Sequence, residues 1–439
     1  MVRSLTLFAT LTASLTLIAA DAPGPTDWPQ WRGPDRTGLS KEIGLLKVWP
    51  KDGPPKKWTA KGLGGGYGSP IIVTGKIYGL GKIEGQECAW CLNEKDGSEV
   101  WLRPTASPKG VGYDEGPRCT PTYSNDPKLG GLIYSVGVGG DLVCLKAETG
   151  ETVWSKNYGM DFGGKMMSSW GFSESPLVDG DKVICTPGGD AAAIVALNKV
   201  TGELIWKAAV PKSGGAGYAS VIKATVGEVP MYITLLGKSG GVVGVHAETG
   251  KELWRYTKIN NPTANIPTVI FRDDLVWCST GYDEGGSALL KLAAEGKDKV
   301  TAKEVKYYNN KTLQNHHGGM VLVDGYVYFG ANHGQGYPSC VEFKSGEVKY
   351  HLSKPLGGGG GSAAIAYADG MLYFYYQNGQ MVMLNATPEE SDLKVAGSFK
   401  IPEPVERVAK WAHPVIANGM LFLRDQHKLH CYNLKAEKN

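Results

Sequence analysis

The sequence predicts an all-β protein, an eight-bladed β-propeller with four antiparallel strands in each blade. Three features predict this fold: an excess of glycine, a turn phrase that recurs along the chain, and a second phrase that starts each repeat. Glycine accounts for 61 of the 439 residues, aromatic residues for 10% and charged residues for 20%. A chain rich in glycine and aromatic residues and poor in charge is typical of many short strands joined by tight turns.

The turn phrase places an aromatic residue four positions after a glycine. It reads Ala-Glu-Thr-Gly-Glu-Thr-Val-Trp at residues 147–154. Related copies occupy residues 93–101, 198–206, 247–254 and 343–350, the last with Tyr350 in place of tryptophan. The glycine suits a turn position with positive φ, and the aromatic residue lies on the strand that leaves the turn. Each copy therefore predicts a β-hairpin.

The second phrase consists of a Ser-Pro or similar pair, an apolar run, an Asp-Gly or Asn-Gly turn, and a strand rich in Val, Tyr and Phe. Clear copies occupy residues 175–180, 320–325, 365–370 and 413–419, and looser copies begin at Ser69, Thr120, Ser220 and Ile266. The eighth unit ends after its third strand, so we expect residues 56–59 to supply the fourth strand and close the ring. A seven-bladed ring is the fallback, because units five and seven are degenerate in their outer halves.

The N-terminal residues predict an exported protein. Residues 1–20 have the positive start, short apolar run and small-residue ending of a signal peptide, with cleavage between residues 20 and 22. We expect an N-terminal arm at 21–55, the propeller at 56–435 and a tail at 436–439. The first cysteine is Cys88, so we expect no lipidated cysteine at the cleavage site. The predicted location is periplasmic or secreted, with no transmembrane segment. The net charge of +3 gives no support for a nucleic-acid partner.

The eight cysteines are interpreted mainly as small buried residues. Cys91, Cys144 and Cys340 each precede a turn glycine by six residues, where other repeats have alanine or glycine. Cysteine in such a position behaves as a small hydrophobic residue. Equivalent positions in neighbouring blades diverge beyond the reach of a disulfide. The sequence also allows a single disulfide that involves Cys88 or Cys119.

The two phrases together resemble the pyrroloquinoline-quinone (PQQ) repeat of the quinoprotein alcohol dehydrogenase-like propellers, from about residue 58 to residue 434. The segment Asp-Trp-Pro-Gln-Trp-Arg-Gly-Pro at residues 27–34 is similar to the start of exported bacterial PQQ-like repeat proteins. The resemblance implies one of two classes: a dehydrogenase that binds PQQ and calcium at the hub, or a non-enzymatic scaffold of the cell envelope. The chain lacks the adjacent cysteine pair of the enzymes and the lipidated cysteine of the scaffold.

We therefore expect a binding or scaffold module with a site at the mouth of the ring. Its expected partners are exported or envelope proteins, or a small molecule. The first alternative is a PQQ- and calcium-dependent dehydrogenase of alcohols or sugars. The second is a carbohydrate- or peptide-binding propeller, favoured by the aromatic residues near the mouth.

Candidate site residues lie before the first strand or after the second strand of each unit, because these positions converge on one face of the ring. The expected ligand residues at this mouth are Tyr218, His316, His317, His333, Trp411 and His413. By approximate position, the resemblance suggests Glu174, Asn261, Asn265, Trp170 and Arg118 for cofactor binding, with Glu174 and Asn265 as calcium ligands and Asp283 as a candidate catalytic base. Trp170 and Trp411 have the flat rings needed to stack a planar ligand or a sugar.

Overall fold

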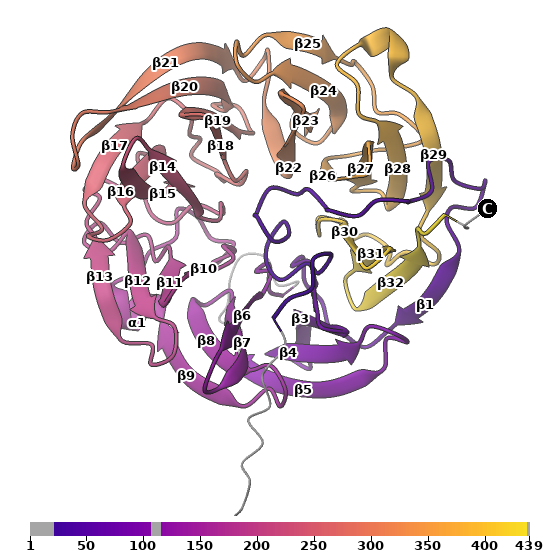
Figure 1. Ribbon diagram of the computed structural model, residues 1–439, viewed down its shortest axis with the longest axis horizontal. Coiled ribbons are helices and arrows are strands. Elements are labelled where there is room, and N and C mark those ends of the chain that lie inside the picture. The colour runs from indigo at the N-terminus through magenta and orange to yellow at the C-terminus, as the bar shows by residue number, and fades with distance from the viewer. Residues whose placement is uncertain (1–21, 107–115, 437–439) are drawn as a thin grey trace, which may run out of the picture.

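The computed structural model describes residues 22–106 and 116–436, so the predicted signal peptide lies outside the described residues. The chain forms eight four-stranded antiparallel sheets, arranged as blades around a central axis (Figure 1). The predicted eight-bladed propeller is confirmed, and the seven-bladed fallback is wrong. Within each of the first seven blades, the strands run in sequence order from the innermost strand, A, to the outermost strand, D; in the last blade strand D is β1.

The strands of the first four blades are β2 (Ile71–Val73), β3 (Lys76–Ile83), β4 (Gln86–Asn93) and β5 (Glu99–Ala106); β6 (Thr122–Asp126), β7 (Gly130–Val136), β8 (Asp141–Lys146) and β9 (Thr152–Asn157); β10 (Leu177–Asp179), β11 (Lys182–Cys185), β12 (Ile194–Asn198) and β13 (Leu204–Ala208); and β14 (Ile222–Val226), β15 (Val229–Leu235), β16 (Val242–His246) and β17 (Glu252–Tyr256).

The strands of the last four blades are β18 (Ile270–Arg272), β19 (Leu275–Thr280), β20 (Gly286–Ala294) and β21 (Val300–Asn309); β22 (Asn315–Val323), β23 (Tyr326–Ala331), β24 (Tyr337–Glu342) and β25 (Val348–His351); β26 (Ala363–Ala368), β27 (Met371–Tyr376), β28 (Gln380–Asn385) and β29 (Val395–Lys400); and β30 (Val415–Ala417), β31 (Met420–Asp425), β32 (Lys428–Asn433) and β1 (Lys56–Ala60). Two short helices, α1 (Tyr158–Phe162) and the 3₁₀ helix η1 (Glu390–Asp392), lie in the connections.

The ring closes as predicted, by pairing the two ends of the propeller. β1 lies antiparallel to β32, with Trp58 opposite Cys431 and Ala60 opposite Leu429. The last blade therefore takes three strands from the end of the chain and its outermost strand from the beginning. This pairing covers an edge of β32 that would otherwise expose unpaired backbone groups.

The recurring turn phrase joins neighbouring blades. The Trp154 indole N–H donates a 3.0 Å hydrogen bond to the carbonyl oxygen of Lys199 in the next blade, and its ring covers Gly202. A Cβ atom on Gly202, which has a φ of +70°, would lie 2.7 Å from that ring. The same indole-to-carbonyl contact joins Trp58 to Glu94, Trp101 to Ala147 and Trp206 to Ala247. The glycines of the first four phrases, Gly97, Gly150, Gly202 and Gly250, thus each receive a tryptophan from the preceding blade, whereas Gly346 of the fifth phrase meets Lys306 instead.

The small residues on strand C lie opposite these aromatic residues. Cys144 pairs across the sheet with Trp154. In the fourth blade Gly244 takes this position opposite Trp254, where a Cβ atom would lie 2.1 Å from the indole nitrogen. The interpretation as a packing position holds, because all eight cysteines, Cys88 and Cys119 included, are buried and free of disulfides.

The Ser-Pro starts form hydrogen bonds between blades at the hub. The Ser69 amide donates to Thr120 Oγ1 at 3.1 Å, and the Thr120 amide donates to Ser175 Oγ at 3.0 Å. The series continues from Ser175 to Ser220 and from Ser220 to Thr268, and the His413 amide donates to Ser69 Oγ. The hydroxyl groups accept from buried backbone N–H groups that would otherwise lack acceptors. We call Ser69, Thr120, Ser175, Ser220 and Thr268 the hub belt.

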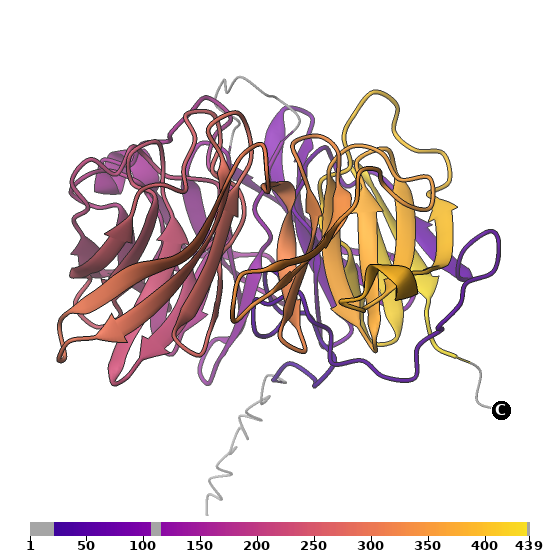
Figure 2. The ribbon, with the colours of Figure 1, turned by 90° about the horizontal axis from the view of Figure 1, so that it is seen from above.

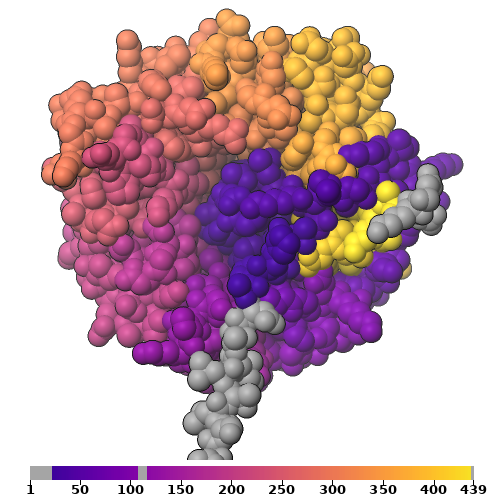
Figure 3. Space-filling view, viewed as in Figure 1, coloured from indigo at the N-terminus to yellow at the C-terminus, as the bar shows by residue number. Residues whose placement is uncertain are grey.

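The N-terminal arm, residues 22–55, covers one end of the ring. It runs along one face of the propeller (Figure 2) and lies over the centre of that face in the space-filling view (Figure 3). Its Trp28 forms an isolated antiparallel bridge with Ile72 of β2. Among the residues that the structure describes, no helix is long and apolar enough to cross a bilayer.

Candidate functional site

A cavity of about 390 Å³ lies at the hub of the ring. Its wall is dominated by aromatic and imidazole side chains: Trp31, Tyr67, Trp170, Tyr218, Tyr282, His316, His317, His333, Trp411 and His413. Arg118, Gln377 and the hub-belt residues Ser175, Ser220 and Thr268 also line it.

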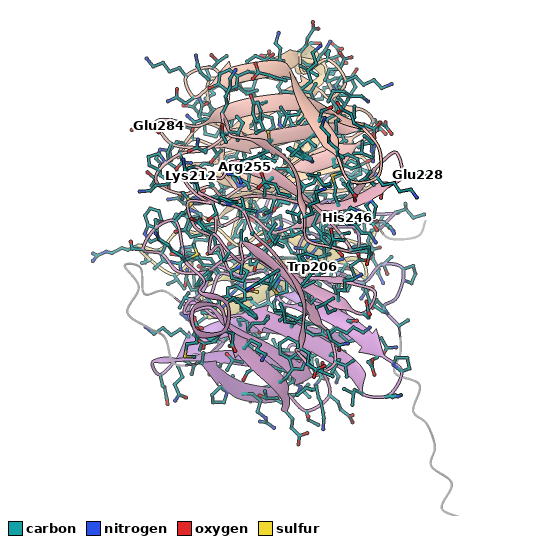
Figure 4. All side chains as sticks on the ribbon, turned by 90° about the vertical axis from the view of Figure 1, so that its left-hand side faces the viewer. Trp206, Lys212, Glu228, His246, Arg255 and Glu284 are labelled. Atoms are coloured by element: carbon teal, nitrogen blue, oxygen red, sulfur yellow. The ribbon has the colours of Figure 1, made fainter. Side chains whose placement is uncertain are left out.

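The cavity mouth lies on the face opposite the arm. Figure 4 labels residues from both faces of the ring. Lys212, in the connection from strand D of one blade to strand A of the next, and Glu284, in a connection from strand B to strand C, lie on one side. Glu228, in the turn from strand A to strand B, and His246, at the end of a strand C, lie on the other side. Most of the aromatic wall comes from D–A and B–C connections, as sequence position predicts for the converging loops of a propeller. The wall is therefore built on loops that are held by the rigid inner strands.

A cluster of histidines forms one side of the cavity. The His316 ring centroid lies 3.7 Å from that of His317 and 4.1 Å from that of His333. Tyr282 packs 4.4 Å from His333, and Trp411 packs 4.2 Å from His317. Sequence neighbours on one strand, His316 and His317, thus contribute to a single surface.

His316, His317 and His413 are neutral near pH 7. Burial lowers the pKa of His317 to about 3 and that of His413 to about 3, and it lowers the pKa of His316 far below its usual range. A neutral imidazole offers one N–H donor and one nitrogen acceptor. Nε2 of His316, Nδ1 of His317 and Nδ1 of His413 are buried without a hydrogen-bond partner among the described residues. The imidazoles therefore add uncharged rings to the wall and leave three buried nitrogens without a partner.

Arg118 is the charged side chain among the described lining residues, which include no carboxylate. It donates a 2.8 Å hydrogen bond to the Trp170 carbonyl oxygen, and its guanidinium carbon lies 5.7 Å from the centroid of the Tyr67 ring. An aromatic wall with one guanidinium and neutral imidazoles favours a ligand that is flat, apolar in its body and negatively charged.

The residues suggested for cofactor binding divide into two groups. Trp170 and Arg118 line the cavity together with all six expected mouth residues: Tyr218, His316, His317, His333, Trp411 and His413. Glu174, Asn261, Asn265 and Asp283 are not among the described lining residues. Asp283 lies exposed in the β19–β20 connection, where its carbonyl oxygen accepts a hydrogen bond from Asn310.

The suggested calcium ligands do not fit calcium at the hub. Asn261 Oδ1 accepts from the Thr263 and Ala264 amides, and Asn265 Oδ1 accepts from the Asn261 amide at 2.9 Å. Glu174 Oε1 accepts from the hydroxyl of Tyr158.

Burial also raises the pKa of Glu174, which disfavours the ionised form that calcium requires. Within the described ranges, no group of three or more His, Cys, Asp or Glu side chains is arranged to hold a metal ion.

Three aromatic residues of the wall were not among the candidates from the sequence. Tyr67 and Tyr282 precede strand A of the first blade and follow strand B of the fifth, so the rule that selected Tyr218 and His333 covers their positions as well. Trp31 comes from the arm. The Trp-Pro-Gln-Trp-Arg-Gly-Pro segment that contains it was noted for its similarity to other proteins, but the sequence assigned it no role in the site.

Comparisons with known proteins place the chain among PQQ-type propellers. The sequence model of the family described as outer membrane protein assembly factor BamB matches residues 86–351. That assembly factor from Aliivibrio fischeri is 30% identical over 93 residues, which cover 21% of this chain and 23% of that protein. The quinoprotein ethanol dehydrogenase of Pseudomonas aeruginosa is 31% identical over 134 residues, which cover 28% of this chain and 21% of that protein. The chain thus aligns with under a quarter of the length of these curated relatives.

Solved structures share the fold over most of the chain. BamB from Moraxella catarrhalis has a TM-score of 0.57 at 14% identity, covering 85% of this chain and 95% of that one. A europium-containing methanol dehydrogenase has a TM-score of 0.63 at 12% identity, covering 91% of this chain and 90% of that one. At these identities the likeness shows the fold alone.

Proposed function

We propose that this chain, which belongs to the propeller family described as outer membrane protein assembly factor BamB, is a binding module whose hub cavity holds a small organic anion with a flat apolar body. The observation that carries the proposal is the cavity wall, which combines aromatic rings and neutral imidazoles with Arg118 and, among the described residues, no carboxylate. Flat apolar groups pack on tryptophan and tyrosine faces, and a carboxylate pairs with a guanidinium.

Buried positive charge around the cavity supports the same ligand class. Arg424 is buried and donates to the carbonyl oxygens of Gly68 at 2.9 Å and Gln426 at 3.0 Å. Burial lowers its pKa to about 9, so it stays protonated at neutral pH. Because carbonyl oxygens satisfy its hydrogen bonds without neutralising its charge, the hub keeps a positive potential that favours an anion.

The dehydrogenase alternative is weakened by the donor set. PQQ is a flat polycarboxylate and so belongs to the proposed ligand class. Calcium, however, needs several oxygen ligands. The side-chain oxygens of Asn261 and Asn265 and Oε1 of Glu174 already accept hydrogen bonds within the protein, which leaves Oε2 of Glu174, buried without a partner, as the remaining oxygen among the three residues. The carbohydrate alternative shares the aromatic wall with our proposal but does not use the charge of Arg118.

Titration calorimetry with matched probes tests the proposal. We expect 2-naphthoate to bind, and we expect both the neutral 2-naphthalenemethanol and acetate, which lacks the flat body, to bind far more weakly. Arg118→Gln should lower the affinity for 2-naphthoate by about tenfold or more, because a hydrogen bond to a charged group contributes about 1.5–3 kcal/mol. The exposed Arg272→Gln is the matched control and should leave binding unchanged.

The other outcomes discriminate between the alternatives. Equal binding of 2-naphthoate and its alcohol would contradict the anion preference. Tight binding of a sugar such as maltose, unaffected by Arg118→Gln, would favour the carbohydrate alternative. PQQ that binds only with calcium, together with dye-linked oxidation of an alcohol, would favour the dehydrogenase.

Family membership also supports an envelope location and envelope protein partners. We propose that the chain is exported, with a mature N-terminus at residue 21 or 23, which N-terminal sequencing of the protein from a periplasmic fraction checks. In a scaffold, the propeller would bind a protein through its surface, leaving the cavity without a ligand. Crosslinking in cells to outer-membrane assembly proteins, combined with no binding of any small probe, would favour that reading over ours.

A further inference from the structure

The N-terminal arm is tied to the inner parts of many blades. Its backbone and side chains form hydrogen bonds with the inner strands or their starts: Ile72 of β2, Tyr123 of β6, Ser175 and Pro176 before β10, Met320 of β22, Tyr367 of β26 and Ile416 of β30. These contacts lie around the hub rather than along one blade. The arm is therefore fixed across the end of the central channel, in agreement with its place in Figures 1 and 3.

Trp31 is the arm residue that lines the cavity. Its indole N–H donates a 3.2 Å hydrogen bond to Thr268 Oγ1 of the hub belt. Its ring meets the His413 ring edge to face, with the centroids 4.5 Å apart. Both partners line the cavity, so the Trp31 side chain stands inside the channel at the end that the arm covers.

Trp28 shows how a purely structural tryptophan of the same arm behaves. It is 2% exposed, packs in the hydrophobic cluster that includes Ile72 and Trp90, and covers Gly33. Trp31, by contrast, is only partly buried and lines the cavity. A tryptophan that served packing alone would bury its ring against side chains, as Trp28 does.

Two buried arginines anchor the segment around Trp31. Arg36 donates to the carbonyl oxygens of Ser175 at 2.7 Å and Pro176 at 3.1 Å, and Arg32 donates to that of Met320 in β22. Burial lowers the pKa of each arginine to about 10, so both remain charged at neutral pH. These bonds do not involve the indole, so the arm has anchors that survive a change at Trp31.

We propose that Trp31 closes the arm-side end of the channel and forms the floor on which the apolar body of the ligand rests, so that the ligand enters and leaves only at the opposite face. The closure follows from the position of the arm alone. The ligand contact rests on the proposed function. Arg118 and Trp31 then divide recognition, the arginine taking the charge and the tryptophan the flat body.

Histidine labelling tests the closure without any ligand. Diethyl pyrocarbonate modification of the full chain, resolved by residue in a mass spectrometer, reports access to His413. In Trp31→Ala we expect His413 to react at least about tenfold faster, because a group that is covered in the native state reacts only through local opening. Trp31→Phe keeps a ring at the floor and should react like the wild type, and Trp31→Leu should lie between. His333, at the other end of the histidine cluster, is the internal reference and should not change.

Equal labelling of His413 in the wild type and in natively folded Trp31→Ala and Trp31→Leu would overturn the closure. The ligand contact is tested with 2-naphthoate, whose affinity should fall about tenfold in Trp31→Ala and stay close to that of the wild type in Trp31→Phe. Faster labelling with unchanged affinity would overturn the contact. Absence of 2-naphthoate binding to the wild type would contradict the proposed function instead, and the labelling would still decide the closure.

Discussion

Removing one hydroxyl from the hub belt should loosen the contact between two blades. In Ser175→Ala, the Thr120 amide loses the acceptor that lies 3.0 Å away. Ser175 is 2% exposed and Thr120 is fully buried, so the Thr120 amide stays buried when the oxygen is lost. A buried donor left without a partner costs about 1–3 kcal/mol. The Ser175 amide and carbonyl keep their bonds to Ser220 and Arg36, so the change is confined to one link.

Hydrogen exchange measures this link directly. We expect the Thr120 amide to exchange roughly 5- to 150-fold faster in Ser175→Ala, which is the same 1–3 kcal/mol expressed as a ratio. The free energy of unfolding from urea denaturation should fall by no more than about 3 kcal/mol, since unfolding exposes the same amide in both proteins.

Ser175→Thr, which keeps the hydroxyl, and the exposed Ser98→Ala are the controls. If the Thr120 amide exchanges at the wild-type rate in Ser175→Ala, the hub belt does not stabilise the blade contact and the reasoning fails.

Further predictions concern buried titratable groups and the tryptophan contacts. Burial raises the pKa of Glu87 to about 7, although its carboxylate accepts a hydrogen bond from the Val138 amide. The folded protein therefore favours the protonated carboxyl group. As pH rises from about 4.5 to 7, the free energy of unfolding of the wild type should fall by up to about 3 kcal/mol relative to that of Glu87→Gln. For His317 the stability changes with pH in the opposite direction. Its folded pKa of about 3 lies below the unfolded value, so the wild type should become less stable relative to His317→Gln as pH falls below about 6.5. Urea denaturation across this pH range checks both. Trp154→Phe keeps an aromatic ring but loses the hydrogen bond to Lys199, so its free energy of unfolding in the same assay should be about 1 kcal/mol lower than that of the wild type. An unchanged value would mean that the tryptophan stabilises the blade contact through packing and not through this hydrogen bond.

The fold was predictable because its signals are local and repeated. Gly202 and Trp206 each make a contact between blades, so their spacing records the geometry of the ring many times over. The closing strand β1 was predictable for a related reason, since the last unit lacked one strand and Trp58 resembled the aromatic residue of a strand D.

The orientation of polar side chains near the mouth was not predictable in the same way. Asn261 lies where a ligand residue was expected, but its side chain accepts from the amides two and three residues ahead and so completes a local turn. Glu174 Oε1 turns to Tyr158, which begins the short helix α1 in the same β9–β10 connection, a contact that no residue spacing predicts. The role of Trp31 depends on the arm folding back across the whole hub, a long-range arrangement that no local pattern records.

Thr268 connects the framework of the ring to its cavity. Its hydroxyl oxygen accepts from the Ser220 amide at 3.3 Å and from the Trp31 indole at 3.2 Å. The link between blades and the floor of the cavity therefore meet at one oxygen atom, and the same side chain lines the cavity. A wall fixed in this way keeps its shape while residues earlier in the loops change, because the loop that carries Trp170 is held at its end by Ser175 of the belt and the loop that carries Trp411 by the bond from His413 to Ser69. Ligand preference can thus vary among propellers of this kind through their loops, and the resemblance of their repeats predicts the ring far better than it predicts the ligand.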